Sequence, residues 1–148
     1  ASDVYKRQAC GGPAVLAAIS DPDLRLRAEQ TIIETTEIVP GAVAALAAGD
    51  TARFGALTAR SQAMAVTHLQ NQVPETIALV TGAHAHDAVA ASSFGAGFGG
   101  AVWAAFKRGN DGSPAWLADY RRRFTQHADA ATLHHITPGP GATLLGLA

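Results

Sequence analysis

Apolar residues in the first half of the chain recur at helical spacing, beginning with residues 24–39. Ser20 or Asp21 can cap this helix, Pro22 suits its first turn, and Pro40 with Gly41 is expected to end it. The pattern predicts one amphipathic helix. Its face is formed by Leu24, Ala28, Ile32, Thr35 and Val39.

Three more helices are expected before residue 87. A short helix over 42–48 ends at a glycine, and Asp50 can cap a third helix whose apolar positions extend over 54–69. Pro74 opens a fourth, which runs to about His86. Helices therefore dominate the first half of the chain.

After residue 86 the pattern changes from helix to strand. Residues 88–94 and 101–106 are short apolar runs bounded by glycine, of strand rather than helix length. A turn-rich loop and a helix over 114–124 follow, and residues 131–136 are a possible third strand before a proline-glycine turn. This order predicts an α+β domain with helices packed on one face of a small antiparallel sheet.

Composition narrows the classes of function. The 148 residues suffice for about one domain, and 48% hydrophobic residues with a net charge of −1 give no electrostatic preference for nucleic acid or an anionic membrane. The run Arg121-Arg122-Arg123 is too short to follow a phosphate backbone and is expected to be a solvated helix face. Cys10 is the single cysteine, which agrees with a reducing, cytoplasmic location. Neither a signal peptide nor a membrane-spanning run is visible.

The first residues do not fit the rest of the pattern. "ASDVYKRQ", residues 1–8, has no apolar period and looks like translated adapter sequence. We expect it to be a non-native segment, with residues 9–148 forming the domain.

A glycine cluster separates the two expected strands. Gly95, Gly97 and Gly100 satisfy G-x-G-x-x-G, but a dinucleotide fold needs a helix directly afterwards and an acid at a later strand end. Neither follows, and the catalytic motifs of protein kinases and a G-x-x-x-x-G-K-[ST] loop are also missing from the sequence. We therefore expect a loop between strands, whose glycines let the backbone approach a neighbour closely.

The stretch Gly95-Ala96-Gly97-Phe98-Gly99-Gly100, followed by an apolar strand, resembles the third motif of the GHMP kinase superfamily, closest to its galactokinase branch. The resemblance extends from about residue 21 to the end of the chain. Softer matches in the same order are Arg27-Ala28-Glu29-Gln30 through Glu34, Ala45-Leu46 to Gly49-Asp50, Phe54-Gly55-Ala56-Leu57, Ser61-Gln62, Pro74-Glu75 and "TPGPGA". Departures from the galactokinase pattern are Gln30, Gln62, Ile77 and Phe94, and they leave the sugar open.

The resemblance implies the C-terminal half of an ATP- and Mg²⁺-dependent kinase, with the ferredoxin-like fold of that half. Its reaction would be phosphorylation of the anomeric hydroxyl of galactose or a related sugar. The phosphate loop and the catalytic carboxylate and arginine of such enzymes lie in the N-terminal half, so no catalytic residue is expected in this chain. The same resemblance implies that the cofactor is bound by Gly95, Ala96, Gly97, Phe98, Gly99 and Gly100. Ser92 and Ser93 would add hydroxyl contacts or support the loop.

Two alternatives stay open. The first is a sensor of the same fold that binds sugar and ATP without turnover, and the second is a superfamily member acting on a non-sugar alcohol. The upstream sequence would separate the first from a kinase, and a substrate panel would separate the second.

Other polar and aromatic residues favour structural roles. His84 and His86 are two apart on an expected helix, so they do not share a face and no metal site is expected. Asn71 and Gln72 are expected to close the loop before Pro74, with contact to a sugar as the alternative. The two tryptophans, Trp103 and Trp116, are expected in the core.

Overall fold

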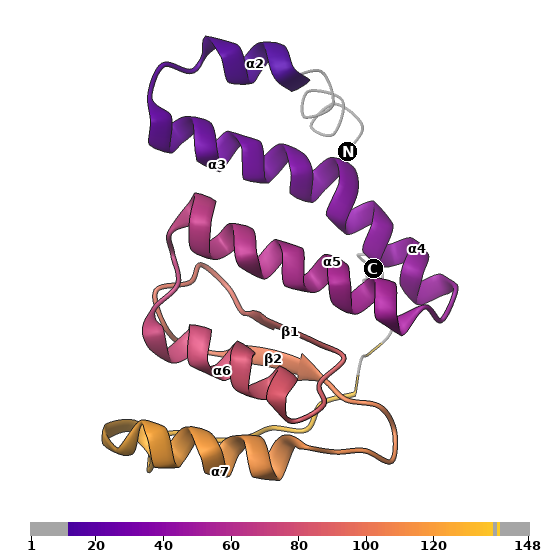
Figure 1. The fold of residues 1–148 in the computed structure, drawn as a ribbon, viewed down its shortest axis with the longest axis vertical. Coiled ribbons are helices and arrows are strands. Elements are labelled where there is room, and N and C mark those ends of the chain that lie inside the picture. The colour runs from indigo at the N-terminus through magenta and orange to yellow at the C-terminus, as the bar shows by residue number, and fades with distance from the viewer. Residues whose placement is uncertain (1–11, 138, 140–148) are drawn as a thin grey trace, which may run out of the picture.

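The structure is a computed structural model that describes residues 12–137 and 139. Its helices lie in a stack, and the two strands lie beside α5 and behind α6 in the lower half of the molecule (Figure 1). In chain order the elements are α2 (Gly12–Ala18), α3 (Pro22–Ile33), η1 (Glu34–Ile38), α4 (Val39–Ala47), α5 (Thr51–Met64), η2 (Ala65–Leu69), α6 (Pro74–Ala85), β1 (Ala90–Ser93), β2 (Val102–Ala105), α7 (Ser113–Arg123) and η3 (Thr125–His127).

Two of the expected helix starts are confirmed by their caps. The Asp21 carboxylate accepts hydrogen bonds from the backbone N–H groups of Asp23 and Leu24, at 2.9 and 3.1 Å. The Asp50 carboxylate accepts one from the N–H of Arg53 at 2.9 Å. Both side chains satisfy donors that the first turn of a helix leaves without partners.

The expected helix end at Pro40 is wrong, because the chain stays helical from Pro22 to Ala47. The segment η1 is a π-helix, in which the N–H of Val39 donates to the carbonyl of Glu34, five residues back. Proline lacks an N–H and its ring crowds the preceding turn of an α-helix. A wider π turn just before Pro40 gives the ring room, so the helix continues through it.

The expected pair of strands is confirmed. β1 and β2 are antiparallel, with Ala90 opposite Ala105 and Ser93 opposite Val102. The proposed third strand at 131–136 is wrong, since no strand forms there. Leu133 instead packs against the hydrophobic core, and the Arg121 guanidinium donates to the carbonyl of Ala131 at 2.6 Å.

The hydrophobic core lies between the sheet and the last two long helices. Trp116 of α7 is buried, and its indole N–H donates to the carbonyl of Leu79 in α6 at 2.9 Å. Val80 and Ala83 of α6 belong to the same cluster, and so does Ala91 of β1. α6 and α7 therefore pack together against the face of the sheet that carries Ala91.

The mixed helix-and-sheet class is confirmed, with helices and a two-stranded antiparallel sheet within the described residues.

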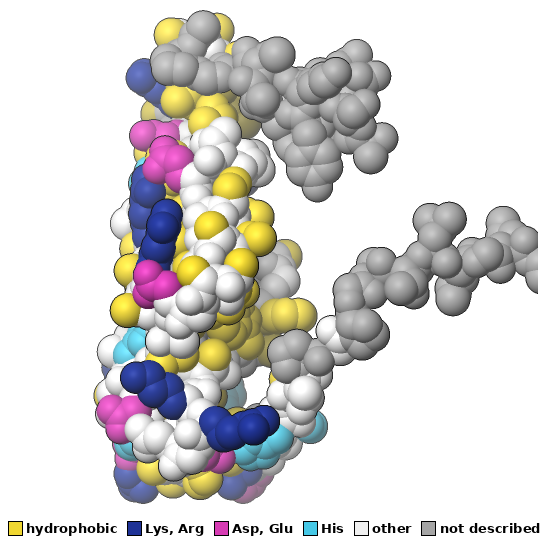
Figure 2. Space-filling view, turned by 90° about the vertical axis from the view of Figure 1, so that its right-hand side faces the viewer, with side chains coloured by type: hydrophobic (Ala, Val, Ile, Leu, Met, Phe, Trp, Pro, Cys, Tyr) yellow, Lys and Arg dark blue, Asp and Glu magenta, His cyan; other side chains and the backbone are white. Residues whose placement is uncertain are grey.

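In the upper part of Figure 2, charged side chains gather toward the left and apolar ones toward the right. Within residues 12–137 and 139, no helix combines the length and the apolar character needed to cross a membrane. The expected adapter segment, Cys10 and most of "TPGPGA" lie outside the described residues.

Candidate functional site

The glycine loop joins β1 to β2, as the sequence predicts. It begins where the N–H of Phe94 donates to the carbonyl of Ala101 at 2.9 Å. Between these residues four glycines have φ values that L-residues rarely adopt, and Phe98 shares this conformation with a φ of 61°. The four are Gly95 (77°), Gly97 (84°), Gly99 (118°) and Gly100 (89°).

Asn71, from the segment between η2 and α6, holds this loop in place. Its side-chain amide donates to the carbonyl of Ala96 at 2.9 Å, and its own carbonyl accepts the N–H of Phe98. A Cβ added to Gly97 would lie 2.3 Å from the Asn71 carbonyl oxygen. The expected close approach of the glycine loop to a neighbouring segment is therefore present, and Asn71 provides that neighbour. The sequence did not identify Asn71 as the residue that meets Gly97, because the two residues lie on separate segments of the chain.

A chain of hydrogen-bonded amides, of which Gln62 is buried and Gln72 partly buried, links β1 to Asn71. The Gln62 side chain of α5 accepts hydrogen bonds from the hydroxyl of Ser92 at 3.1 Å and the N–H of Ser93 at 2.9 Å. Its amide donates to Gln72 at 3.3 Å, and Gln72 donates to the side-chain oxygen of Asn71 at 2.9 Å. Ser92 and the backbone of Ser93 thus bind inward to α5, and both residues support the loop.

The loop backbone offers hydrogen-bond donors to solvent. Among the described residues, the backbone N–H groups in the turn have no acceptor, except those of Phe94 and Phe98. Phe94 and Phe98 are 67% and 73% exposed, so the turn stands at the surface. Backbone N–H groups without an acceptor are donors that an anion can use. The N–H groups without an acceptor belong to Gly95, Ala96, Gly97, Gly99 and Gly100.

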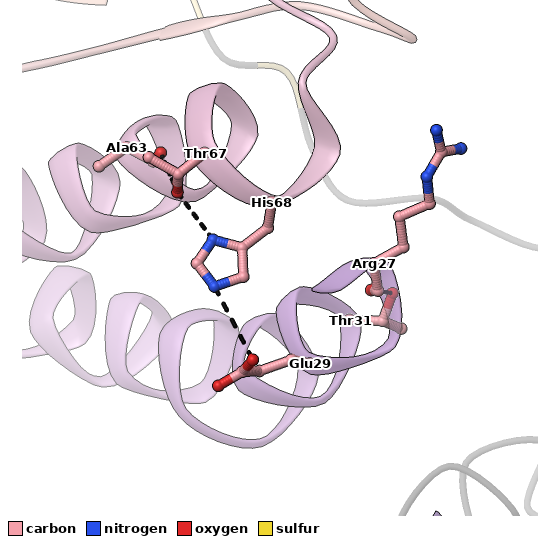
Figure 3. A network of polar contacts seen from close by, with 6 residues as sticks. All are labelled: Arg27, Glu29, Thr31, Ala63, Thr67 and His68. Carbon is pink, nitrogen blue, oxygen red and sulfur yellow. Dashed lines mark hydrogen bonds and ion pairs between the residues drawn. The ribbon is translucent and has the colours of Figure 1, made fainter. Parts of the chain in front are cut away.

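A second polar network lies around His68, shortly before Asn71 in the chain. In Figure 3 the His68 ring of η2 lies between the hydroxyl of Thr67, 2.7 Å from Nδ1, and the carboxylate of Glu29 on α3, 4.0 Å from Nε2. The Thr67 hydroxyl also donates to the carbonyl of Ala63 at 3.0 Å. The His68 ring thus lies at the contact between η2 and α3.

Three further histidines, His84, His86 and His127, have partners within the protein. His84 Nδ1 lies 3.2 Å from the carbonyl of Ala88, and His86 contacts the carboxylate of Asp119 on α7. His127 lies 3.7 Å from the carboxylate of Glu75. In the part of the chain that the structure describes, no three His, Cys, Asp or Glu side chains gather as a metal site would require.

The arginine run at the end of α7 makes contacts within the protein. Arg121 binds the carbonyl of Ala131, Arg122 pairs with Asp119, and Arg123 lies 5.5 Å from the ring centre of Phe124. These guanidinium groups remain largely at the surface, as expected of a solvated helix face.

Trp103 departs from the expectation of a core residue. It is only partly buried, and its ring lies 6.3 Å from that of Phe54 at the start of α5. Trp116, in contrast, is in the core as expected.

No protein-family model matches the chain, and the search of curated proteins finds no significant match. Interpretation of the site therefore depends on its geometry and on the residues of the glycine motif.

Proposed function

We propose that the chain is the C-terminal part of an ATP-dependent sugar kinase of the GHMP type. In this proposal, residues 94–101 form the wall of the nucleotide site that faces the phosphates. The observation that supports it best is the exposed turn with five N–H groups free of acceptors in the described structure, anchored at Gly97 by Asn71. The hairpin would belong to the ferredoxin-like sheet of such kinases.

The chemistry of phosphoryl transfer suits a loop of this kind. The transferring group carries charge on its oxygens, and catalysis depends on fixed donors and orientation. Backbone N–H groups held by a rigid hairpin provide donors whose positions need little rearrangement. The loop supplies no acid or base, so its role is to bind and orient phosphate.

Other parts of the reaction are assigned outside these residues. A phosphate loop, a carboxylate near the sugar hydroxyl and a cation near the transferred phosphate would come from the N-terminal half. Mg²⁺ would neutralise charge on the phosphates when bound, and we assign no ligand for it to this chain. A polypeptide without those groups is expected to show no turnover.

The substrate we propose is galactose or a related sugar, phosphorylated at its anomeric hydroxyl. Gln62 stands where galactokinases have histidine. Its side-chain oxygen accepts hydrogen bonds from Ser92 and Ser93, and its NH2 group donates to Gln72. These contacts give Gln62 a role in supporting the loop.

The test uses the protein encoded by the whole reading frame that contains these residues. ADP release and sugar phosphate would be measured with galactose, related hexoses and a non-sugar alcohol such as mevalonate. Formation of a sugar 1-phosphate supports the proposal. Binding of ATP and sugar without turnover identifies a sensor, turnover with only the alcohol identifies the other kinase type, and binding of neither contradicts the proposal.

A further inference from the structure

A hollow that does not include the free N–H groups of the glycine loop is bounded by η1, α4, α5 and the strands. Its volume is about 260 Å³, slightly below the roughly 300 to 1,000 Å³ of most ligand pockets. An occupant would therefore be small. The polar groups that line it are Glu34, Thr58, Ser61 and Ser92.

Glu34 brings a carboxylate to this hollow without a cation to balance it. Its oxygens accept the Ser61 hydroxyl at 3.1 and 3.0 Å and the amide of Gln30 at 3.4 Å. Among the described residues Glu34 makes no ion pair, whereas Glu37, one turn further on, pairs with Arg60 at 2.8 Å. The wall is thus negative, and it disfavours an anionic occupant.

The hydroxyl groups of the hollow already donate their protons within the protein. Thr58 donates to the carbonyl of Phe54 at 3.0 Å, Ser61 to Glu34, and Ser92 to Gln62. Each hydroxyl oxygen keeps lone pairs for another partner. Together with the carboxylate, they form a group of acceptors that matches a ligand rich in donors.

The remaining wall is apolar and aromatic. Phe54 and Trp103 contribute their rings, and Ile38 adds an aliphatic surface. Aromatic faces attract organic cations as well as apolar groups. Glu34 and Ile38 are the first and last residues of the π-helix η1, a feature often found where helices form functional sites.

We infer that this hollow binds a small organic ammonium ion, with its N–H groups toward Glu34 and the hydroxyl oxygens and its apolar body against Phe54 and Trp103. A primary arylalkylamine has this chemistry, because it is a donor-only cation on a compact apolar group. The ammonium site does not require the proposed kinase activity, since the loop N–H groups take no part in it and only Ser92 belongs to both the loop support and the hollow.

The direct test measures binding to the 148-residue chain by titration calorimetry with three matched probes. They are 2-phenylethylammonium, the neutral 2-phenylethanol and the anionic 3-phenylpropionate. The ammonium ion is expected to bind about tenfold or more tightly than the alcohol, because the alcohol lacks the positive charge that strengthens the hydrogen bond to Glu34. The anion is expected not to bind, because the Glu34 carboxylate repels it. Absence of ammonium binding, or equal affinity for the alcohol, would overturn the inference.

Two matched variants locate the site. Glu34→Gln removes the charge with little change of shape and is expected to weaken ammonium binding by about tenfold or more. Glu37→Gln, on the same π-helix but outside the hollow, is expected to bind like the parent chain. Equal weakening by both variants would overturn the assignment.

A third variant keeps the test decisive if Glu34→Gln does not fold, which circular dichroism would show. Ala42 lines the hollow, so the larger side chain of Ala42→Leu is expected to fill part of it while Glu34 is kept. A folded Ala42→Leu chain is expected to lose ammonium binding. Retention of the parent affinity in that chain would place the ligand elsewhere and refute the inference.

Discussion

The glycines of the hairpin loop are not equivalent, although all four have positive φ. A Cβ on Gly97 would collide with Asn71, whereas a Cβ on Gly95 would meet nothing within 4 Å. Gly95→Ala therefore tests the backbone conformation alone, and Gly97→Ala adds loss of the contact with Asn71.

We predict that Gly95→Ala lowers the free energy of unfolding by about 1 to 2 kcal/mol. Gly97→Ala is expected to lower it by roughly 2 to 4 kcal/mol, because the hydrogen bonds to Asn71 are disturbed as well. Chemical denaturation of the two variants measures the difference. Equal losses would show that the contact with Asn71 contributes no stability.

Asp111, at the start of α7, gives a pH dependence of known sign. The hydroxyl and the N–H of Ser113 beside it lower the pKa of Asp111 from its ordinary value. A lowered pKa in the folded chain stabilises it at pH above about 4, the ordinary value for aspartate, and the contribution disappears as the pH falls through the folded pKa.

An NMR titration of the Asp111 carboxyl group should therefore give a midpoint below that of an unstructured aspartate. In Ser113→Ala the midpoint should stay below the ordinary value, because the N–H that donates to the Asp111 carboxylate at 3.0 Å remains. A parent midpoint at or above the ordinary value would contradict the assignment.

Among single residues, contacts between near neighbours in the chain could be predicted from the sequence, and contacts between residues far apart in the chain could not. Asp21 and Asp50 could be identified as caps because their partners are two or three residues away. The contact between Asn71 and Gly97 depends on how the hairpin meets the loop before α6, which residue types alone do not encode. The glycines indicated that the loop backbone comes close to another segment, but the sequence did not indicate which segment.

At the scale of elements, Gly55 allows α5 a close approach to the backbone just before β1. A Cβ on Gly55 would lie 2.1 Å from the carbonyl oxygen of Val89, which belongs to the backbone just before β1. A second helical glycine, Gly41, would meet only the flexible side chain of Leu57, at 3.0 Å. Comparing alanine substitutions at Gly55 and Gly41 separates the cost of a packing clash from the stability that a helix usually gains when glycine is replaced.

We predict that Gly55→Ala destabilises the chain by about 1 to 3 kcal/mol, because α5 must move away from the strand. Gly41→Ala is expected to be neutral or to stabilise by up to about 1 kcal/mol. Thermal and denaturant unfolding of both variants would measure this. A Gly55→Ala chain as stable as the parent would show that the helix and strand are not closely fitted.

The elements themselves were largely predictable because their signals are local. Capping residues and prolines at helix starts, and glycines around the strands, identified most of them. The continuation of the helix through Pro40 could not be predicted, since it requires a π turn that the sequence does not indicate. The segment 131–136 has the composition of a strand, but α7 and the core offer it contacts that no strand partner provides.

At the scale of the whole molecule, the α+β class followed from helices preceding a pair of short strands. The hollow beside Glu34 could not be predicted, because its walls come from segments as far apart as η1 and β2. The supporting chain from Gln62 through Gln72 to Asn71 likewise joins three separate segments. The glycine motif was recognisable on its own, but the structure supplies the contacts that fix its shape.

The central claim is that the glycine loop faces phosphate in a sugar kinase, and the kinetics of one pair of variants test it most directly. In the protein encoded by the whole reading frame, kcat/KM for ATP would be measured with the sugar that it phosphorylates. We predict a loss of about a hundredfold or more in Gly97→Ala, corresponding to roughly 3 kcal/mol of transition-state binding, and a much smaller loss in Gly95→Ala. Unchanged kcat/KM for ATP in a folded Gly97→Ala enzyme would contradict the account.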